Sequence, residues 1–175
     1  MAADANCPPS LATEALFAYG SLLMRWESPD TNQPLANFEL ATNLFKQLAA
    51  SQTTNQLGAL ALSELGDCNL QLGAYAAATN AYGQVMASPF ASAGLRNRAQ
   101  VGLGRVLEKM AEQTSAENRS ALMDQALRNY LDVLYADDEA DPFWVKKAGL
   151  LALPLLTAKN ADQADRFIDR MEALL

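Results

Sequence analysis

The sequence predicts an all-α fold made of antiparallel helix pairs, and three observations lead to this prediction. Half of the 175 residues are apolar but only 7% are aromatic, because alanine and leucine recur throughout. These two residues have high helix propensity, and small side chains allow helices to pack closely. No long run alternates β-branched with polar residues and no Asn-Gly or Asp-Gly turn occurs, so strands are not expected. Small and large residues, finally, repeat at helical spacing along the chain.

The clearest helix pair spans residues 65–89. Gly66 has no side chain, so a neighbouring helix can approach it closely, and Ala78 offers the same on the second helix. Tyr82 lies four residues beyond Ala78 and therefore shares its helix face. Gly73 stands between the two apolar runs, where a residue that tolerates positive φ can end a helix. The stretch therefore predicts two antiparallel helices joined by a tight turn at Gly73.

Three further stretches repeat this pattern of a glycine in one helix and an alanine in the next, followed four and seven positions later by large residues. They are Gly20 with Ala41, Phe45 and Leu48; Gly104 with Ala126, Tyr130 and Val133; and Gly149 with Ala164, Ile168 and Met171. The four alanines are separated by 37, 48 and 38 residues, so the period is irregular. Inserted turns at 28–34 and 112–119 account for the longer connections in the first and third pairs.

The pattern resembles the tetratricopeptide repeat, in which Trp, Leu-Gly, Tyr, Ala, Phe and a late Pro recur about every 34 residues. Three positions depart from the family, since Leu62 stands where it has Trp, Asn69 where it has Tyr, and Pro89 comes one residue early. The resemblance implies a right-handed superhelix of about four antiparallel pairs, with the first helix of each pair lining a concave groove. The residues that carry the resemblance are Leu65, Gly66, Ala78, Tyr82 and Pro89.

Eight helices follow from the pattern and its breaks. We expect a flexible N-terminus at 1–9 and one helical-repeat domain at 10–175. Pro142 starts a helix by the usual rules, whereas Pro154 inside the seventh helix predicts a kink near 150–153 or an early end. The expected helices span 10–26, 35–50, 54–72, 74–87, 92–111, 119–135, 142–158 and 161–174, which form the pairs 10–50, 54–87, 92–135 and 142–174.

Charge and apolar patterning exclude several classes of partner. The net charge of −7 argues against non-specific binding to nucleic acid or to an anionic membrane. The longest apolar stretch, 148–156, is far shorter than the roughly 20 residues needed to span a bilayer. Residues 1–10 have neither the basic start nor the apolar run of a signal peptide. We therefore expect a soluble chain, cytoplasmic, or periplasmic if it is a fragment of an exported protein.

Catalytic, cofactor-binding and metal-binding residues are not expected. The absence of histidine removes the usual Ser-His-Asp and Cys-His arrangements and the commonest metal ligand. Cys7 and Cys68 are too few for a zinc site, and Cys68 is predicted to be a small buried residue. The acidic run at 137–141 lacks the glycine and spacing of a calcium loop.

A basic stripe is the main candidate site for a partner. Arg98, Arg105 and Lys109 are seven and four residues apart, so they share one face of the fifth helix. They could contact an acidic side chain or a peptide carboxylate, or they could form a solvated face balanced by Glu108 or other acidic neighbours. Comparable faces of the third and seventh helices carry the other candidates, which are Asp67, Gln71 and Lys146.

The resemblance implies a non-enzymatic interaction module. In the family's manner, its groove would bind a partner peptide or helix, as part of a larger bacterial protein or assembly. The alternative is a structural module that associates with itself through apolar end faces, for which the apolar end 171–175 is a candidate. An exposed Trp26, at the end of the first helix, would indicate a terminal contact with neighbouring sequence outside this chain.

Overall fold

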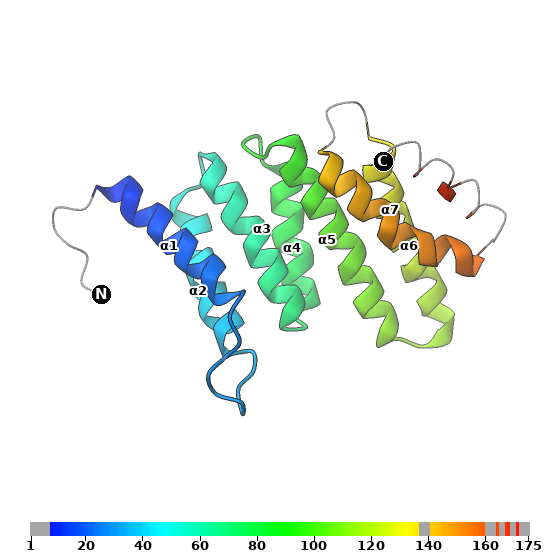
Figure 1. Ribbon diagram of the computed structural model, residues 1–175, viewed down its shortest axis with the longest axis horizontal. Helices are drawn as coiled ribbons and strands as arrows, with labels where there is room; N and C mark the ends of the chain where they lie inside the picture. The colour runs from blue at the N-terminus through cyan, green and yellow to red at the C-terminus, as the bar shows by residue number, and fades with distance from the viewer. Residues whose placement is uncertain (1–7, 137–140, 160–163, 165–166, 169–170, 172–175) are drawn as a thin grey trace. The chain divides into compact units, whose positions relative to one another are not determined.

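All regular structure in the computed structural model is helical, as predicted. The structure describes residues 8–136 and 141–159, together with 164, 167, 168 and 171, and no strand occurs among them. The helices are α1 (Pro9–Leu23), α2 (Ala36–Ser51), α3 (Gln56–Gln71), α4 (Tyr75–Ala87), α5 (Ala93–Glu112), α6 (Ala116–Leu134) and α7 (Pro142–Lys159) (Figure 1). None of these helices is long and apolar enough to cross a membrane.

The chain forms two compact units, 1–91 and 92–175. The first unit contains α1 to α4 and the second contains α5 to α7, so each unit holds two of the predicted helix pairs. The prediction of one continuous domain from 10 to 175 stays a prediction.

In the first unit, helices that follow one another in sequence pack side by side. α1 contacts α2, α2 contacts α3, and α3 contacts α4. Cys68 is fully buried in this core, as predicted from the sequence. The core residues are Leu23, Ala41, Phe45, Leu48, Ala61, Leu65, Cys68 and Ala81.

Gly73 lies in the turn between α3 and α4, where it was predicted to end the first helix of the pair. Its φ is +72°, which side chains other than glycine rarely adopt. The Ala74 N–H donates to the Asn69 carbonyl at 2.8 Å, and the Gly73 N–H donates to the Leu70 carbonyl at 3.1 Å. These two bonds form the Schellman motif, which satisfies carbonyls at the end of α3 and turns the chain towards α4.

In the second unit, α5, α6 and α7 pack together around a separate core. α6 packs against both α5 and α7, and α5 also contacts α7. α7 begins at Pro142, and the Asp141 carboxylate accepts the Phe143 N–H at 2.9 Å. The core residues are Val101, Ala126, Leu127, Tyr130, Val133, Leu134, Ala148, Ala152, Leu156, Ala164 and Phe167.

Two expected helix boundaries are wrong by three residues each. The first helix ends at Leu23, three residues before the predicted end. The sixth helix begins at Ala116 and not at residue 119, so the predicted turn at 112–119 is shorter. Glu117 lies in the first turn of α6, where the helix dipole favours an acidic side chain. The Arg119 side chain also donates to the Ala111 carbonyl at 3.2 Å, which satisfies one terminal carbonyl of α5.

α7 runs through Pro154 to Lys159, so of the two expected outcomes the early end is wrong, whereas the kink near 150–153 stays a prediction. Pro154 and Leu150 both lie on the exposed side of the helix. Water can therefore reach the carbonyl of Leu150, which loses its usual N–H partner at a proline. Most of the predicted eighth helix lies outside the described residues, although 164, 167, 168 and 171 are helical.

Candidate partner-binding site

The repeat residues meet across the predicted helix pairs. A Cβ on Gly20 would lie 2.8 Å from Cζ of Phe45, and a Cβ on Gly66 would lie 2.7 Å from Cδ1 of Tyr82. In the second unit, a Cβ on Gly104 would lie 2.7 Å from Cζ of Tyr130. Distances under 3.0 Å are too short for a methyl group, so each glycine leaves the space that a ring fills. The close approach predicted at these three glycines is confirmed, and we call each contact a packing joint. The alanines of the pattern, Ala41, Ala78 and Ala126, are fully buried.

The fourth joint differs from the predicted pattern. The Met171 side chain, and not Ile168, occupies the space beside Gly149. Ile168 is 38% exposed, whereas Phe167 and Ala164 are buried in the core of the second unit. Residues three and four positions beyond an alanine lie on nearly the same helix face, so sequence spacing alone did not separate Phe167 from Ile168.

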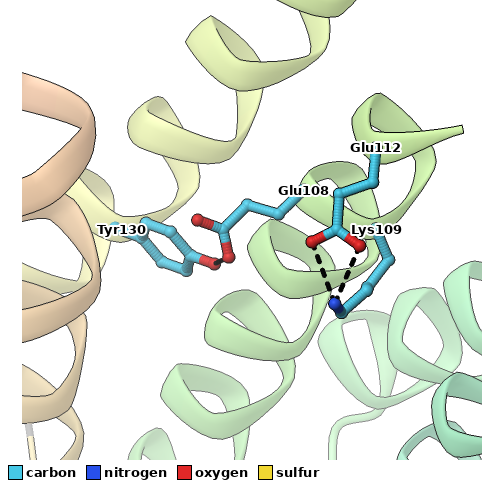
Figure 2. Close-up of polar contacts among 4 residues, drawn as sticks. All are labelled: Glu108, Lys109, Glu112 and Tyr130. Carbon is cyan, nitrogen blue, oxygen red and sulfur yellow. Dashed lines mark hydrogen bonds and ion pairs between the residues drawn. The ribbon is translucent and has the colours of Figure 1, made fainter. Parts of the chain in front are cut away.

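Both tyrosines of the packing joints donate their hydroxyl to a carboxylate on the preceding helix. Tyr82 donates to Asp67 at 2.5 Å, and Tyr130 donates to Glu108 at 2.8 Å (Figure 2). A tyrosine with a buried ring needs a partner for its hydroxyl, and a carboxylate is a strong acceptor. Asp67, a predicted partner-binding residue, therefore has an internal structural role in the α3–α4 pair.

The surroundings of Glu108 shift the pKa of its carboxylate in opposite directions. Burial is the largest cause that raises its pKa above the usual value, and Glu112 also raises it. The Tyr130 hydroxyl, Arg105 and Lys109 favour the charged form and lower the pKa. Burial raises the pKa of Tyr130, and Glu108 raises it further. Tyr130 therefore keeps its proton at neutral pH and acts as the donor.

The basic stripe of Arg98, Arg105 and Lys109 lies along α5 and is partly balanced by acidic residues of the same helix. The ammonium of Lys109 donates to both carboxylate oxygens of Glu112, at 2.9 Å each (Figure 2). Lys109 is exposed, whereas Arg98 and Arg105 are half-buried. The two arginines are therefore the less exposed members of the stripe.

The other predicted contact residues are divided between the two units. Lys146 is half-buried on α7, a helix that contacts α5 within the second unit. Gln71 is the exposed last residue of α3 in the first unit. The structure therefore brings Lys146 to a helix next to the stripe, whereas Asp67 and Gln71 belong to a different unit.

Two features of the second unit were missed from the sequence. Gln100 on α5 donates to Asn129 on α6 at 2.9 Å, a polar link across the helix pair. An open groove of about 350 Å³ lies between α6 and α7, and the ion pair of Lys159 with Asp124, at 2.8 Å, lies at its edge. Neither feature has a signal in the sequence, because each depends on the register of one helix against another.

Catalytic chemistry gains no support from the described part of the chain. Within those ranges, no three His, Cys, Asp or Glu side chains gather in a way that could hold a metal ion. Burial raises the pKa of the Cys68 thiol from 9.0 to about 12, so it is a poor nucleophile. Comparison with known proteins finds no match, since neither a family model nor a curated protein matches the chain.

Proposed function

We propose that the chain is a non-enzymatic protein-interaction module of the tetratricopeptide-like kind. In this proposal, about four antiparallel helix pairs form a right-handed superhelix, and its concave groove binds a peptide or a helix of a partner protein.

Recurrence of one packing joint supports this proposal. A glycine of the first helix faces a large side chain of the second helix in four successive pairs, which lie in two different units. Helix pairs of one design that recur along a chain are typical of stacked-repeat proteins, whose outer helix faces bind partners. The contacts that unite each pair are Gly20 with Phe45, Gly66 with Tyr82, Gly104 with Tyr130 and Gly149 with Met171.

The chemistry of α5 favours an acidic partner. Arg98 and Arg105 are half-buried, and a guanidinium can form two parallel hydrogen bonds to one carboxylate. Lys109 is already paired with Glu112 and adds less. Lys146 lies on α7, a helix that packs against α5. A peptide with Asp or Glu side chains, or with a free terminal carboxylate, is the partner that this surface fits.

A peptide-display selection on the full chain tests the proposal. We expect the recovered peptides to be rich in Asp and Glu. The variant Arg98→Glu plus Arg105→Glu should bind them at least 30-fold more weakly, because disrupting a buried charge pair costs about 2–5 kcal/mol. The matched control is Arg25→Glu plus Arg128→Glu, which changes the net charge equally at two exposed arginines.

Two results would contradict the proposal. Equal binding by the two double variants would remove the basic stripe from the binding site. A selection that enriches no peptide over a display library without target would oppose the interaction module itself. Circular dichroism and urea unfolding of each variant establish that lost binding does not reflect a lost fold.

A further inference from the structure

The outer face of α1 is an apolar stripe. Leu11, Ala15, Ala18 and Leu22 follow one another at intervals of four, three and four residues, so they share one side of the helix, with Tyr19 beside them. Leu11 is 56% exposed, Tyr19 is 52% exposed and Leu22 is 40% exposed, and both alanines are exposed as well. We call these five residues the α1 stripe.

The opposite side of α1 is apolar too. Gly20 lies against Phe45 of α2, Leu23 is buried in the core of the first unit, and the Phe17 ring meets Phe45 edge to face at 5.6 Å. By contrast, the exposed side of α2 carries polar residues such as Glu39 and Lys46. A helix that is apolar on both sides is typical of a buried helix, and the α1 stripe has no cover among the described residues of the first unit.

Trp26 extends the stripe beyond the end of the helix. The backbone N–H of Trp26 donates to the Leu22 carbonyl at 3.2 Å, and the backbone carbonyl of Trp26 accepts a hydrogen bond from the Asn37 side-chain amide at 3.0 Å. Trp26 is four residues beyond Leu22 and is 63% exposed. Two hydrogen bonds therefore hold its backbone in place while its indole remains accessible, as is typical of aromatic residues that anchor an interface.

We propose that a second copy of this chain covers the α1 stripe in an antiparallel, two-fold symmetric contact. With the axis near Ala18 and Tyr19, Ala15 faces Leu22 of the second copy, and Ala18 faces Tyr19 of the second copy. Leu11 faces the other copy's Trp26 in the same register. In the two central pairings a small residue thus lies opposite a large one, and at each end two large apolar residues meet, which makes the surface complementary to itself.

Charge and area favour a second copy over a different protein. Glu14 is the single charged residue of α1 and lies at the edge of the stripe, three residues beyond Leu11 and four before Ala18. In the antiparallel register Glu14 faces position 23 of the second copy, so two acidic chains can meet there without bringing the two Glu14 carboxylates together. A different partner would ordinarily be distinguished by polar or charged contacts, which the stripe does not offer. A fully exposed aromatic side chain has about 150–250 Å² of accessible surface. At the exposed fractions given above, Tyr19, Trp26 and the four aliphatic residues of the stripe together present on the order of 500 Å² of accessible surface per copy. A dimer would bury roughly 1,000 Å², which is the lower bound for a specific interface.

Sedimentation velocity and light scattering on the full chain test this proposal. Between about 1 and 200 µM, a range that includes a micromolar Kd, we expect the mass to rise from one 18.8 kDa chain to two. Because the contact is two-fold symmetric, Leu22→Glu places one charge in it from each copy. The substitution should therefore raise the Kd of the dimer at least 100-fold. Leu40→Glu, at a 52% exposed leucine of α2, is the matched control and should leave the dimer unchanged.

Oxidative cross-linking tests the antiparallel geometry. In a Cys7→Ser background, Ala18→Cys lies beside the axis and should form a disulfide with its own copy, whereas Asn43→Cys on the exposed side of α2 should not. A wild-type chain that stays monomeric over the whole range would overturn the proposal. So would a dimer that persists in Leu22→Glu, or equal cross-linking at both cysteines.

Discussion

Replacing Gly66 by alanine perturbs the packing joint of the α3–α4 pair by one methyl group. The new Cβ would overlap the ring of Tyr82, which is fully buried and cannot swing into solvent. Ring displacement would also pull the Tyr82 hydroxyl away from Asp67, which accepts its hydrogen bond at 2.5 Å. One substitution therefore disturbs both the packing and the polar contact of this pair.

Three effects set the size of the change. Overpacking a core costs about 1–3 kcal/mol, and losing a hydrogen bond to a charged group costs about 1.5–3 kcal/mol. Alanine in the middle of a helix is favoured over glycine by about 0.5–1 kcal/mol. The Gly66→Ala variant should therefore lose about 2–5 kcal/mol of unfolding free energy.

Urea unfolding followed by far-ultraviolet circular dichroism measures this loss. Gly83→Ala is the matched control, since Gly83 is an exposed glycine of α4 and its added Cβ would meet nothing within 4 Å. That control should be more stable than wild type by about 0.5–1 kcal/mol. If Gly66→Ala is as stable as wild type, or gains as Gly83→Ala does, the close approach of Gly66 and Tyr82 is refuted.

Two further predictions concern titration. Because the folded-state pKa of Glu108 is raised, its contribution to stability is fully present below about 4.5, the unfolded value, and is lost as the pH rises through the folded value. Glu108→Gln keeps an oxygen acceptor for Tyr130 but does not titrate, so it does not share the loss of stability that the wild type undergoes as the pH rises. The urea midpoint of the variant should therefore rise relative to that of the wild type between about pH 4.5 and 8. A difference between the two midpoints that stays constant with pH would contradict this prediction. The Cys68 thiol, with its pKa raised to about 12, should react with a disulfide reagent at pH near 8 at least 100-fold more slowly in the folded than in the unfolded Cys7→Ser variant. Equal rates would show that the thiol is accessible.

The helical fold was predictable because its signals are local. Gly73 was expected to end a helix from its place between two apolar runs, and it has the positive φ that this requires. Close approach at Gly20, Gly66 and Gly104 was also predicted, since a residue without a side chain lets a neighbouring helix come near, but the ring that fills each space was not. The predicted helix boundaries were wrong where contacts between helices contribute. One example is the start of α6, where the Arg119 side chain donates to the Ala111 carbonyl of the previous helix.

The polar contacts of the candidate site were not predictable, because they depend on helix register. The sequence indicated that Asp67 belongs to an accessible helix face, but it did not indicate that Tyr82 would reach it. Glu108 was considered as a counter-charge for the stripe, yet its hydrogen-bond donor is Tyr130 on the neighbouring helix. A buried tyrosine one turn from an alanine is a usable signal, because its hydroxyl must find an acceptor.

The basic stripe on α5 and the apolar stripe on α1 lie in different units and carry different chemistry, so the two proposals can be separated experimentally. Leu22→Glu changes a residue that is far in sequence from Arg98. It should abolish the dimer and leave the affinity of each chain for an acidic peptide unchanged. Arg98→Glu plus Arg105→Glu should have the converse effect. If both properties fail together in either variant, dimerisation and peptide binding are coupled, and avidity across two copies, not independent binding, must be considered.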